Sequence, residues 1–488
     1  MVIISRKPNR CREKPSIEKE LYLYQYEDYG SKICDIMFFE RLESKGLAHY
    51  SYIIAQGNEG FVIDPRRDCS TYSDLSIRNG FRITHIFETH RNEDYVIGSV
   101  GLAHLTGANI WHADSQLKYG YGDAIDDGQI WKIGGLKVQA MFSPGHTPGS
   151  VSYLLHDPNG SPWILFTGDA LFAGDVGRVD LLGMERAPEM AHLLYDTLFN
   201  KVLPLGDGVI VCPAHGAGSV CGSAIAGRPW TTIGFERRHN PKLQVMDEDE
   251  FATHVAQKNE HPPYFRQMEN LNLQGASSFE SLPPPQPLSP SEFFQNASDG
   301  MVVDTRMELG YGAAHVPGSL SMWLEGLPSF AGWFLSYDTP LFLVNETEDP
   351  MSAVLYLSRI GYDDIRGYLA GSMLSWHMKG YESEGTPMVT VQDLCKKIDS
   401  EKNLWILDVR SREEAEKSGE IHGAHQIHVT QIPHHLIDIP QNQTVYVFCG
   451  SGLRSMLAAS YLQREGWKKV VVVLGGLSGW NSTSCPLE

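Results

Sequence analysis

Four short polar segments in the first half of the chain carry residue types that bind metal ions. They are THRNEDY at 89–95, SPGHTPGS at 143–150, TGDALF at 167–172 and PAHGAGS at 213–219. Histidine nitrogens and aspartate oxygens are common ligands of zinc and iron in proteins. The segments therefore predict a metal centre in this half of the chain.

A second candidate chemistry lies near the C-terminus, at Cys449. The segment FCGSGLRS at 448–455 ends an apolar run and begins a helical pattern. Glycines let backbone N–H groups approach the sulfur, and a helix start adds a positive potential, so both features favour a thiolate. We expect a persulfide on Cys449 to be closed in by Arg454 and cradled by the four residues between them: Gly450, Ser451, Gly452 and Leu453.

The polar segments follow apolar runs that are typical of buried strands. In the first half the runs are 82–87, 136–142, 163–166 and 209–212, and each ends at a polar turn. In the second half, 340–344 and 444–448 have the same character, and each precedes a helical pattern. Strands that end at candidate ligands are expected to place those ligands along one sheet edge.

The second half of the chain contains a tandem repeat. MVVDTR at 301–306 is echoed by WILDVR at 405–410, and further echoes keep an offset near 105 residues. At that offset Cys449 aligns with Val344 and Arg454 with Asp349. We divide the chain into an extension at 1–31, a metal-binding domain at 32–275, a Pro/Ser-rich linker at 276–290, and two repeats at 291–383 and 387–488.

Composition excludes several classes of function. The 488 residues carry a net charge of -19, which argues against nucleic acid and anionic membrane as partners. No apolar run approaches the roughly 18 residues of a membrane span. The N-terminus has no apolar core after its charges, so we expect no secretory signal. Eight cysteines without a CxxC pair predict a cytoplasmic protein with reduced thiols, and we expect a homo-oligomer.

The four polar segments, in their order along the chain from 89–95 to 213–219, resemble those of the metallo-β-lactamase superfamily. The resemblance implies an αββα sandwich with metal at the sheet edge. Hydrolases of that family usually carry HxHxDH in the first segment and hold two zinc ions. Here Asn92 and Tyr95 replace two of those histidines. An amide is a poor zinc ligand, and a tyrosine binds well only as phenolate, so the two-metal mechanism is compromised.

The residues that remain are His90, His146 and Asp169. Two histidines and one carboxylate form the triad of non-haem Fe(II) oxygenases, which leaves open positions on the ion. The pattern resembles the persulfide dioxygenases, and the resemblance implies one Fe(II) per chain, with zinc as the alternative. It implies that O₂ oxidises a low-molecular-weight thiol persulfide to sulfite. We expect the other polar residues to lie in the second coordination sphere: Asn92, Asp94, Tyr95 and His215.

Two further residues are candidates for contact with the substrate. Arg178 lies in AGDVGRVDLLG at 173–183, which resembles a family segment beyond the metal Asp. It could pair with a substrate carboxylate or fix its own loop through Asp180. Cys221, six residues beyond His215, could receive sulfur or form a mixed disulfide, although a free cysteine is more often a small buried apolar residue.

Together with LDVR at 407–410 and LGGLSGW at 474–480, the Cys449 loop resembles the rhodanese family. Its CxxxxR spacing is one residue shorter than in related phosphatases, which suits a sulfane sulfur. The first repeat has NETED at 345–349 and no thiol, so we expect a structural domain with parallel α/β fold. The overall expectation is a persulfide dioxygenase fused to a sulfurtransferase that forms sulfite or thiosulfate. The alternatives are a zinc hydrolase of a thioester or lactone and a non-catalytic scaffold.

Overall fold

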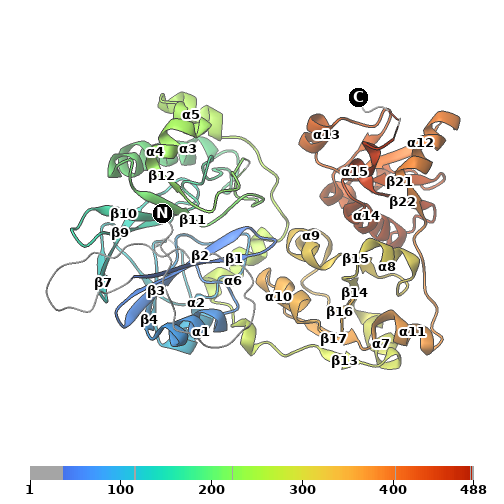
Figure 1. Cartoon of the computed structure of the whole chain (residues 1–488), viewed down its shortest axis with the longest axis horizontal. Coiled ribbons are helices and arrows are strands. Elements are labelled where there is room, and N and C mark those ends of the chain that lie inside the picture. Colours follow the sequence, from blue (N-terminus) through green and yellow to red (C-terminus); the bar gives the residue numbers. More distant parts are fainter. Residues whose placement is uncertain (1–36, 115–116, 223, 402, 484, 486–488) are drawn as a thin grey trace, which may run out of the picture.

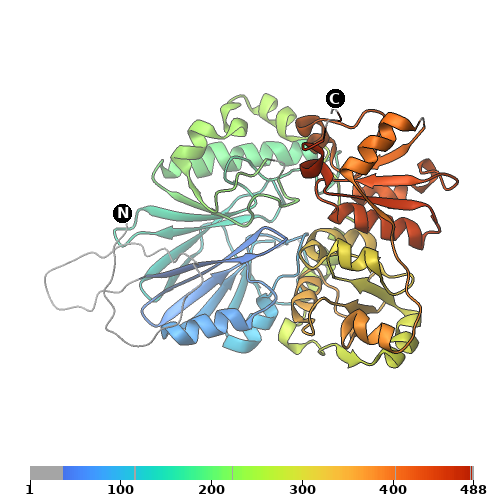
Figure 2. The same cartoon turned by 45° about the vertical axis from the view of Figure 1, so that its right-hand side comes forward.

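The computed structural model describes residues 37–488 apart from 115–116, 223, 402, 484 and 486–488. The predicted extension at 1–31 lies outside the described residues. The metal-binding domain forms one side of the molecule, and the two repeats lie beside each other on the other side (Figures 1 and 2). No helix in the described part of the chain is long and apolar enough to cross a membrane.

Two six-stranded sheets form the centre of the metal-binding domain. The first has the order β1-β2-β3-β4-β5-β6 and contains β1 (Phe38–Ser44), β2 (His49–Gln56), β3 (Glu59–Ile63), β4 (Arg82–Phe87), β5 (Asn109–His112) and β6 (Asp123–Ala124). The second has the order β12-β11-β10-β9-β8-β7 and contains β7 (Ile130–Ile133), β8 (Leu136–Phe142), β9 (Val151–His156), β10 (Pro162–Gly168), β11 (Ile210–Pro213) and β12 (Thr231–Thr232).

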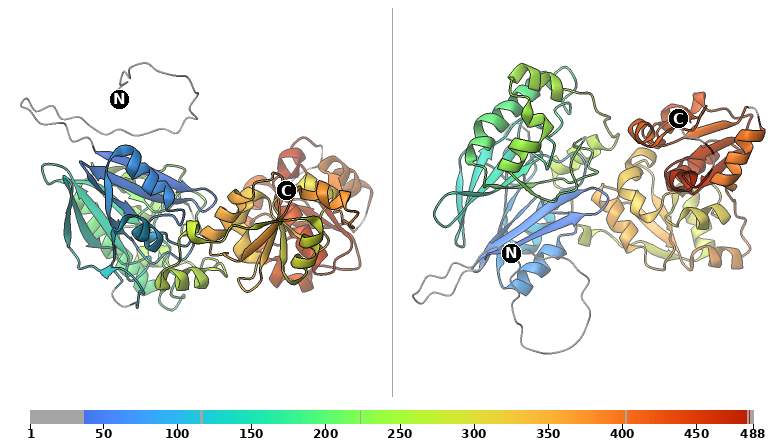
Figure 3. Two further views of the ribbon diagram at one scale, coloured as in Figure 1. Left: turned by 90° about the horizontal axis from the view of Figure 1, so that it is seen from below. Right: turned by 45° about the horizontal axis from the view of Figure 1, so that its top comes forward.

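Helices cover the outer faces of the two sheets (Figure 3). They are α1 (Ser70–Asn79), α2 (Ser99–Thr106), α3 (Ala187–Tyr195), α4 (Ile233–His239) and α5 (Glu248–Val255). Helix α6 (Phe265–Gln274) instead packs with residues 95–97 and the first repeat. Alternation along the strands explains the layers, because successive side chains point to opposite faces. In β10, Ile164 and Phe166 pack in the core between the sheets, whereas Leu165 packs in the core that contains α3. The predicted αββα sandwich is confirmed.

Each repeat contains a five-stranded sheet in which every pairing is parallel. The first has the order β13-β17-β16-β14-β15 and contains β13 (Gln286–Leu288), β14 (Met301–Asp304), β15 (Leu320–Ser321), β16 (Leu341–Val344) and β17 (Ile365–Leu369). The second has the order β18-β22-β21-β19-β20 and contains β18 (Met388–Thr390), β19 (Trp405–Asp408), β20 (His425–Gln426), β21 (Val445–Phe448) and β22 (Val470–Leu474). The predicted parallel α/β repeats are confirmed.

The helices of the repeats surround these sheets. The first repeat contains α7 (Pro290–Asn296), α8 (Glu308–Ala313), α9 (Leu327–Phe334), α10 (Met351–Arg359) and α11 (Ser372–Met378). The second contains α12 (Val391–Ser400), α13 (Arg412–Ser418), α14 (Leu453–Arg464) and α15 (Gly476–Trp480). Helix α14 also contacts the first repeat, where Ser460 Oγ accepts a hydrogen bond of 3.0 Å from Ser321 N. The two repeats therefore share an interface along this helix.

Strand pairing corrects the alignment between the repeats. Asp304 pairs with Val344 in the first repeat, and Asp408 pairs with Phe448 in the second. Val344 therefore matches Phe448, and Asn345 takes the position of Cys449. The predicted match of Cys449 with Val344 is wrong by one residue.

The connection after this strand also differs between the repeats. It spans 345–350 before α10 but only 449–452 before α14, so the first repeat is two residues longer here. Arg454 is the second residue of α14, and Ser352 holds that place in α10. The predicted match of Arg454 with Asp349 is therefore wrong as well.

The segment predicted as a linker contacts the domains on both sides. Arg67 Nε of the metal-binding domain donates to Ser277 O at 3.0 Å, and Glu280 Oε1 accepts from Ser70 N at 2.7 Å. Further along, Gln286–Leu288 forms β13 and pairs with β17 of the first repeat. The boundaries of the linker remain a prediction.

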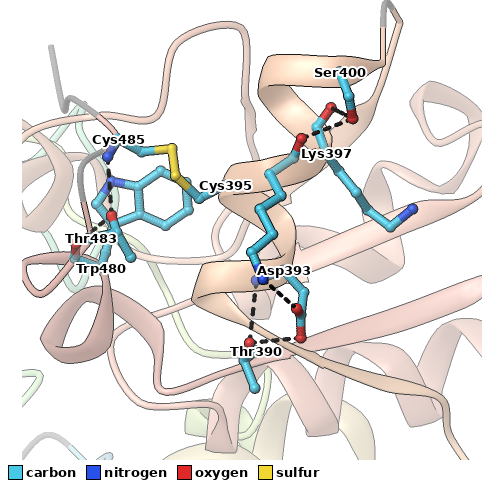
Figure 4. The surroundings of a disulfide bond; sticks show 9 residues. Thr390, Asp393, Cys395, Lys397, Ser400, Trp480, Thr483 and Cys485 are labelled. Atoms are coloured by element: carbon cyan, nitrogen blue, oxygen red, sulfur yellow. Dashed lines mark hydrogen bonds and ion pairs between the residues drawn. A yellow bond between two sulfur atoms is a disulfide. The ribbon is translucent and has the colours of Figure 1, made fainter.

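A disulfide joins Cys395 of α12 to Cys485, and its Cα atoms lie 5.9 Å apart (Figure 4). The prediction that all thiols are reduced is wrong for this pair. The two residues are 90 positions apart, so their spacing carries no motif, and only the fold of the second repeat brings them together. The free cysteines of the described chain are Cys69, Cys212, Cys221 and Cys449, all buried.

Candidate metal centre

The candidate ligands follow the carboxyl ends of four strands. His90 follows β4 of the first sheet, whereas His146, Asp169 and His215 follow β8, β10 and β11 of the second. The expectation of one sheet edge is therefore corrected: the ligands meet where the edges of two sheets face each other. A sandwich achieves this because both sheets end their strands at the same rim.

His90, His146 and Asp169 converge on one point. Asp169 Oδ2 lies 3.7 Å from His90 Nε2 and 3.4 Å from His146 Nε2. All three side chains are buried. Ligand atoms about 2.1 Å from a shared ion lie roughly 3 to 3.5 Å apart, depending on the coordination geometry. The observed separations are close to that range, so the three residues can serve one ion.

Neighbouring groups fix both histidine rings. His146 Nδ1 lies 2.9 Å from Arg178 O, and His90 Nδ1 lies 2.9 Å from Thr89 Oγ1. The Thr89 hydroxyl in turn donates to Asp64 Oδ2 at 2.7 Å. These contacts favour a proton on Nδ1 and leave the lone pair of Nε2 directed at the centre. Burial lowers the pKa of His90 to about 3, so its imidazole is neutral, as a metal ligand must be.

His215 lies between two carboxylates. Its Nδ1 is 2.8 Å from Asp169 Oδ1, and its Nε2 is 2.9 Å from Asp94 Oδ2. Burial lowers the pKa of His215, but Asp169 and Asp94 outweigh it and raise the pKa well above its usual value. This position suits the predicted role outside the ligand set, because His215 orients the ligand Asp169 through Nδ1.

We call residues 89–97 the metal segment. Besides His90, it places Asn92 and Tyr95 near the same point. Asn92 Nδ2 donates to His90 O at 3.2 Å, and the Tyr95 ring stacks on His49 with centroids 3.8 Å apart. Burial raises the pKa of Tyr95 well above its usual value, which disfavours the phenolate that a metal would need. Neither replacement therefore restores a strong imidazole-like ligand.

Several buried atoms at this point have no hydrogen-bond partner. They are His90 Nε2, His146 Nε2, His215 Nε2, His49 Nε2, Asn92 Oδ1, Asp94 Oδ1, Tyr95 Oη and both carboxylate oxygens of Glu93. Leaving a buried polar atom unpaired costs about 1–3 kcal/mol, so a collection rich in acceptors is unfavourable unless a cation neutralises it. These residues fit a divalent metal ion, which His90, His146 and Asp169 would hold.

Two further residues lie at the centre. Cys221 was predicted as a possible substrate contact, and Glu93 was not predicted. Cys221 has its sulfur within 4.8 Å of ligand atoms of Asp94 and His215, and likewise of His146 and Asp169. Glu93, which the sequence did not single out, has a carboxylate oxygen within 4.8 Å of ligand atoms of His90 and His146. The one signal in the sequence for a role of Glu93 was its position as a second carboxylate beside Asp94.

Arg178 is held by its own loop. Its Nε and Nη2 donate to Asp180 at 2.7 and 2.9 Å, and its Nη1 donates to Val220 O and Glu260 O. Every guanidinium nitrogen therefore has a protein acceptor. This geometry favours the loop-fixing alternative over contact with a substrate carboxylate.

The predicted persulfide loop lies at the start of α14, in the second repeat. Gly452 N donates to Cys449 Sγ at 3.1 Å, and Cys449 is fully buried. Arg454 lies beside Gly450, and its two terminal nitrogens lie 2.6 and 2.8 Å from the carboxylate of Glu414. The backbone approach to sulfur that the sequence predicts is therefore present, with Glu414 as an unforeseen partner of Arg454.

Two family models match separate parts of the chain. Residues 45–215 match the model of the metallo-beta-lactamase superfamily, and residues 390–483 match that of the rhodanese-like domain. A protein of Mycobacterium tuberculosis, described only as uncharacterized, is 38% identical over 229 residues, which cover 41% of this chain and 95% of that protein. The chain belongs to the metallo-β-lactamase–rhodanese fusion family.

Relatives of this fusion family carry two different activities in their names. The persulfide dioxygenase ETHE1 of Bos taurus is 29% identical over 41% of this chain and 73% of its own length. The hydroxyacylglutathione hydrolase GloC of Haemophilus influenzae is also 29% identical, over 37% of this chain and 86% of its own length. Among solved structures, a metallo-beta-lactamase from Staphylococcus aureus superposes with a TM-score of 0.63 and 29% identity, covering 68% of this chain and 99% of that one.

Proposed function

We propose that the chain is a non-haem iron persulfide dioxygenase fused to a sulfurtransferase. The reaction would oxidise the terminal sulfur of a low-molecular-weight R–S–SH with O₂ and water, giving sulfite and the thiol R–SH. The observation that carries this proposal is the ligand set, in which two histidines and Asp169 converge while His215 is held by carboxylates. Named persulfide dioxygenases among the relatives support it.

The residues of the centre have distinct tasks in this reaction. His90, His146 and Asp169 would hold Fe(II), which supplies the redox chemistry that O₂ requires. His215 holds Asp169 in place through Oδ1 and leaves Oδ2 facing the two histidines. Burial of the whole set excludes bulk water, which protects a reactive sulfur species from side reactions.

Two cysteines are available for sulfur handling. Cys221 lies at the metal centre and could accept a sulfane sulfur or form a mixed disulfide with the substrate thiol. Cys449 lies in the loop of the second repeat, where Gly452 N donates to its sulfur. Transfer of sulfane sulfur from Cys449 to sulfite would give thiosulfate, so the two activities on one chain could act in sequence.

Metal analysis with an oxygen electrode tests the proposal. Protein purified without oxygen should hold about one iron per chain and should consume O₂ with a thiol persulfide. Asp169→Ala and His146→Ala should lose both iron and O₂ uptake. Two tightly bound zinc ions, or full O₂ uptake in Asp169→Ala, would remove the dioxygenase assignment.

The second candidate is a zinc hydrolase of a thioester or lactone. The hydroxyacylglutathione hydrolases among the relatives favour it, as does Cys221 beside Asp94 and His215. This candidate predicts thioester hydrolysis that needs no O₂ and persists when zinc replaces iron. The zinc hydrolase would be favoured if a thioester is hydrolysed under argon faster than O₂ is consumed with a thiol persulfide in air.

A further inference from the structure

We propose that Glu93 is a fourth protein ligand of the metal ion, beside His90, His146 and Asp169. This inference rests on the proposed function, because it concerns the ion that the dioxygenase would use. Glu93 is not required by the two-histidine, one-carboxylate pattern. Its assignment comes from its position and its lack of partners.

The geometry of the contact between Glu93 and His146 fits a shared cation. Glu93 Oε1 lies 2.9 Å from His146 Nε2. Because Nδ1 of His146 faces Arg178 O, a neutral ring directs the lone pair of Nε2 at the carboxylate. Two ligand atoms at right angles around an ion with bonds of about 2.1 Å are about 3 Å apart. The 2.9 Å separation therefore matches two ligands of one ion.

Glu93 has no other role within the described structure. The residue is 1% exposed, and apart from the 2.9 Å contact of Oε1 with His146 Nε2 neither carboxylate oxygen has a partner. A buried carboxylate without donors is strongly unfavourable, whereas one that binds a metal is a common arrangement. The neighbouring Asp94 faces His215 at the same distance of 2.9 Å, so the two adjacent acids contact different histidines.

The charge of the site supports a fourth ligand. Two neutral histidines and Asp169 around a divalent ion would leave one buried positive charge. A second carboxylate makes the set electrically neutral, which lowers the cost of burying it. Four protein ligands on a six-coordinate ion would still leave two positions for the reactants.

The backbone holds Glu93 in this place from two sides. Asn272 of α6 donates to Asn92 O and Tyr95 O at 2.6 and 2.8 Å. Val96 N donates to Arg359 O of the first repeat at 2.8 Å. These bonds flank Glu93 in the sequence, so its carboxylate is positioned before any ion binds.

Metal affinity of four variants tests the inference. Glu93→Gln, Glu93→Asp, His90→Ala and Glu269→Gln are purified, stripped, and titrated anaerobically with Fe(II) and Co(II) against a chelator. Glu93→Gln should bind each ion at least about tenfold more weakly, as expected when metal-site partners are lost. The visible spectrum of its Co(II) form should also change. Glu269→Gln is the control, because Glu269 pairs with Arg91 of the metal segment at 2.6 Å without reaching the centre.

Thermal unfolding separates a ligand from a structural residue. Without metal, Glu93→Gln should be at least as stable as the wild type, because the amide can keep the contact with His146 and removes a buried charge. With metal, the variant should gain less stability. Lower stability of the stripped variant would indicate a structural role and overturn the inference. If Glu93→Gln fails to fold, Glu93→Asp carries the test, and wild-type affinity in that variant has the same consequence.

The variants also distinguish failure of this inference from failure of the proposed function. Wild-type affinity and spectrum in Glu93→Gln, together with loss of metal in His90→Ala, would overturn the role of Glu93 and leave the metal centre intact. Wild-type affinity in His90→Ala as well would remove the metal centre, and both proposals with it.

Discussion

Arg359 of the first repeat pairs with Asp68 of the metallo-β-lactamase domain. Its Nε and Nη2 lie 3.0 and 2.9 Å from Asp68 Oδ1, and both side chains are buried. Its carbonyl oxygen accepts a hydrogen bond from Val96 of the metal segment. The first repeat, which has Asn345 at the position of Cys449, therefore supports the loop that carries His90 and Asp94.

Arg359→Ala should destabilise the protein by about 1–3 kcal/mol, because it removes two buried hydrogen bonds to Asp68 Oδ1 and leaves Arg66, at 2.7 Å from Oδ2, as the remaining partner. It should also lower metal retention, because the Arg359 side chain fixes the backbone whose carbonyl oxygen accepts the hydrogen bond from Val96 N. Urea unfolding and metal content after dialysis measure the two effects. Arg366→Ala is the control, because Arg366 forms an exposed pair with Asp364 that contributes at most about 1 kcal/mol. Equal losses in both variants would contradict this role of Arg359.

Asn272→Ala should weaken metal binding without touching a ligand. The variant removes two hydrogen bonds to carbonyls of the metal segment and a third from Ile97 N at 2.9 Å. Each buried group left unpaired costs about 1–3 kcal/mol. Metal titration and thermal unfolding measure the result. Asn270→Ala, an exposed asparagine of the same helix, should behave as the wild type; a comparable loss there would point to the helix as a whole.

Cys449→Ser should abolish sulfur transfer from thiosulfate to cyanide and leave most O₂ uptake with a persulfide. The reason is that Cys449 and the metal ligands lie in separate domains. Stripping the metal should have the opposite effect on the two activities. Sulfur transfer that survives in Cys449→Ser would remove the residue from its proposed role.

Glu414 should give the second repeat a specific acid sensitivity. Hydrogen bonds from Arg454 lower the pKa of Glu414 to about 2, below the roughly 4.3 of an unfolded chain. The pair therefore stabilises the fold above pH about 4.3, and this contribution is lost as the pH falls toward 2. Urea unfolding from pH 7 to pH 3 should show a smaller decrease for Glu414→Gln than for the wild type. Glu416→Gln, from an exposed pair on the same helix, should keep the wild-type slope.

Loss of the Cys395–Cys485 bond should destabilise the second repeat by about 2–4 kcal/mol, because the bond closes a long loop of the unfolded chain. Cys395→Ser, Cys485→Ser and the double variant should unfold at the same lowered temperature. Reductant should bring the wild type to that temperature and leave the variants unchanged. Additive losses would mean that the two thiols act separately.

Local sequence patterns were sufficient to predict the strands that precede the candidate ligands. The runs at 82–87 and 136–142 coincide with β4 and β8, because alternating apolar residues and polar turns mark both ends of a half-buried strand. The same patterns placed His90 and His146 at strand ends. The resemblance to known families supplied the assembly of these strands into a sandwich and two repeats.

Features that depend on distant parts of the chain could not be predicted in this way. The backbone on both sides of Glu93 is held by Asn272 and Arg359, which lie far along the sequence. The match between Asn345 and Cys449 requires the register of paired strands, since the echoes alone shift by a residue. The partners of Cys395 and Arg454 likewise become visible only when the second repeat is folded.

Strand β13 has a consequence for how this chain could be divided. It forms the outermost strand of the first repeat, and Pro287 within it cannot donate to another strand. Proteolysis just before Pro290 would uncover β17, whose free backbone groups would then be open to pairing with other chains. The stretch between the metal-binding domain and the first repeat therefore covers an edge of the sheet, and recombination that exchanges the domains would have to carry it along with the repeat whose β17 it pairs with.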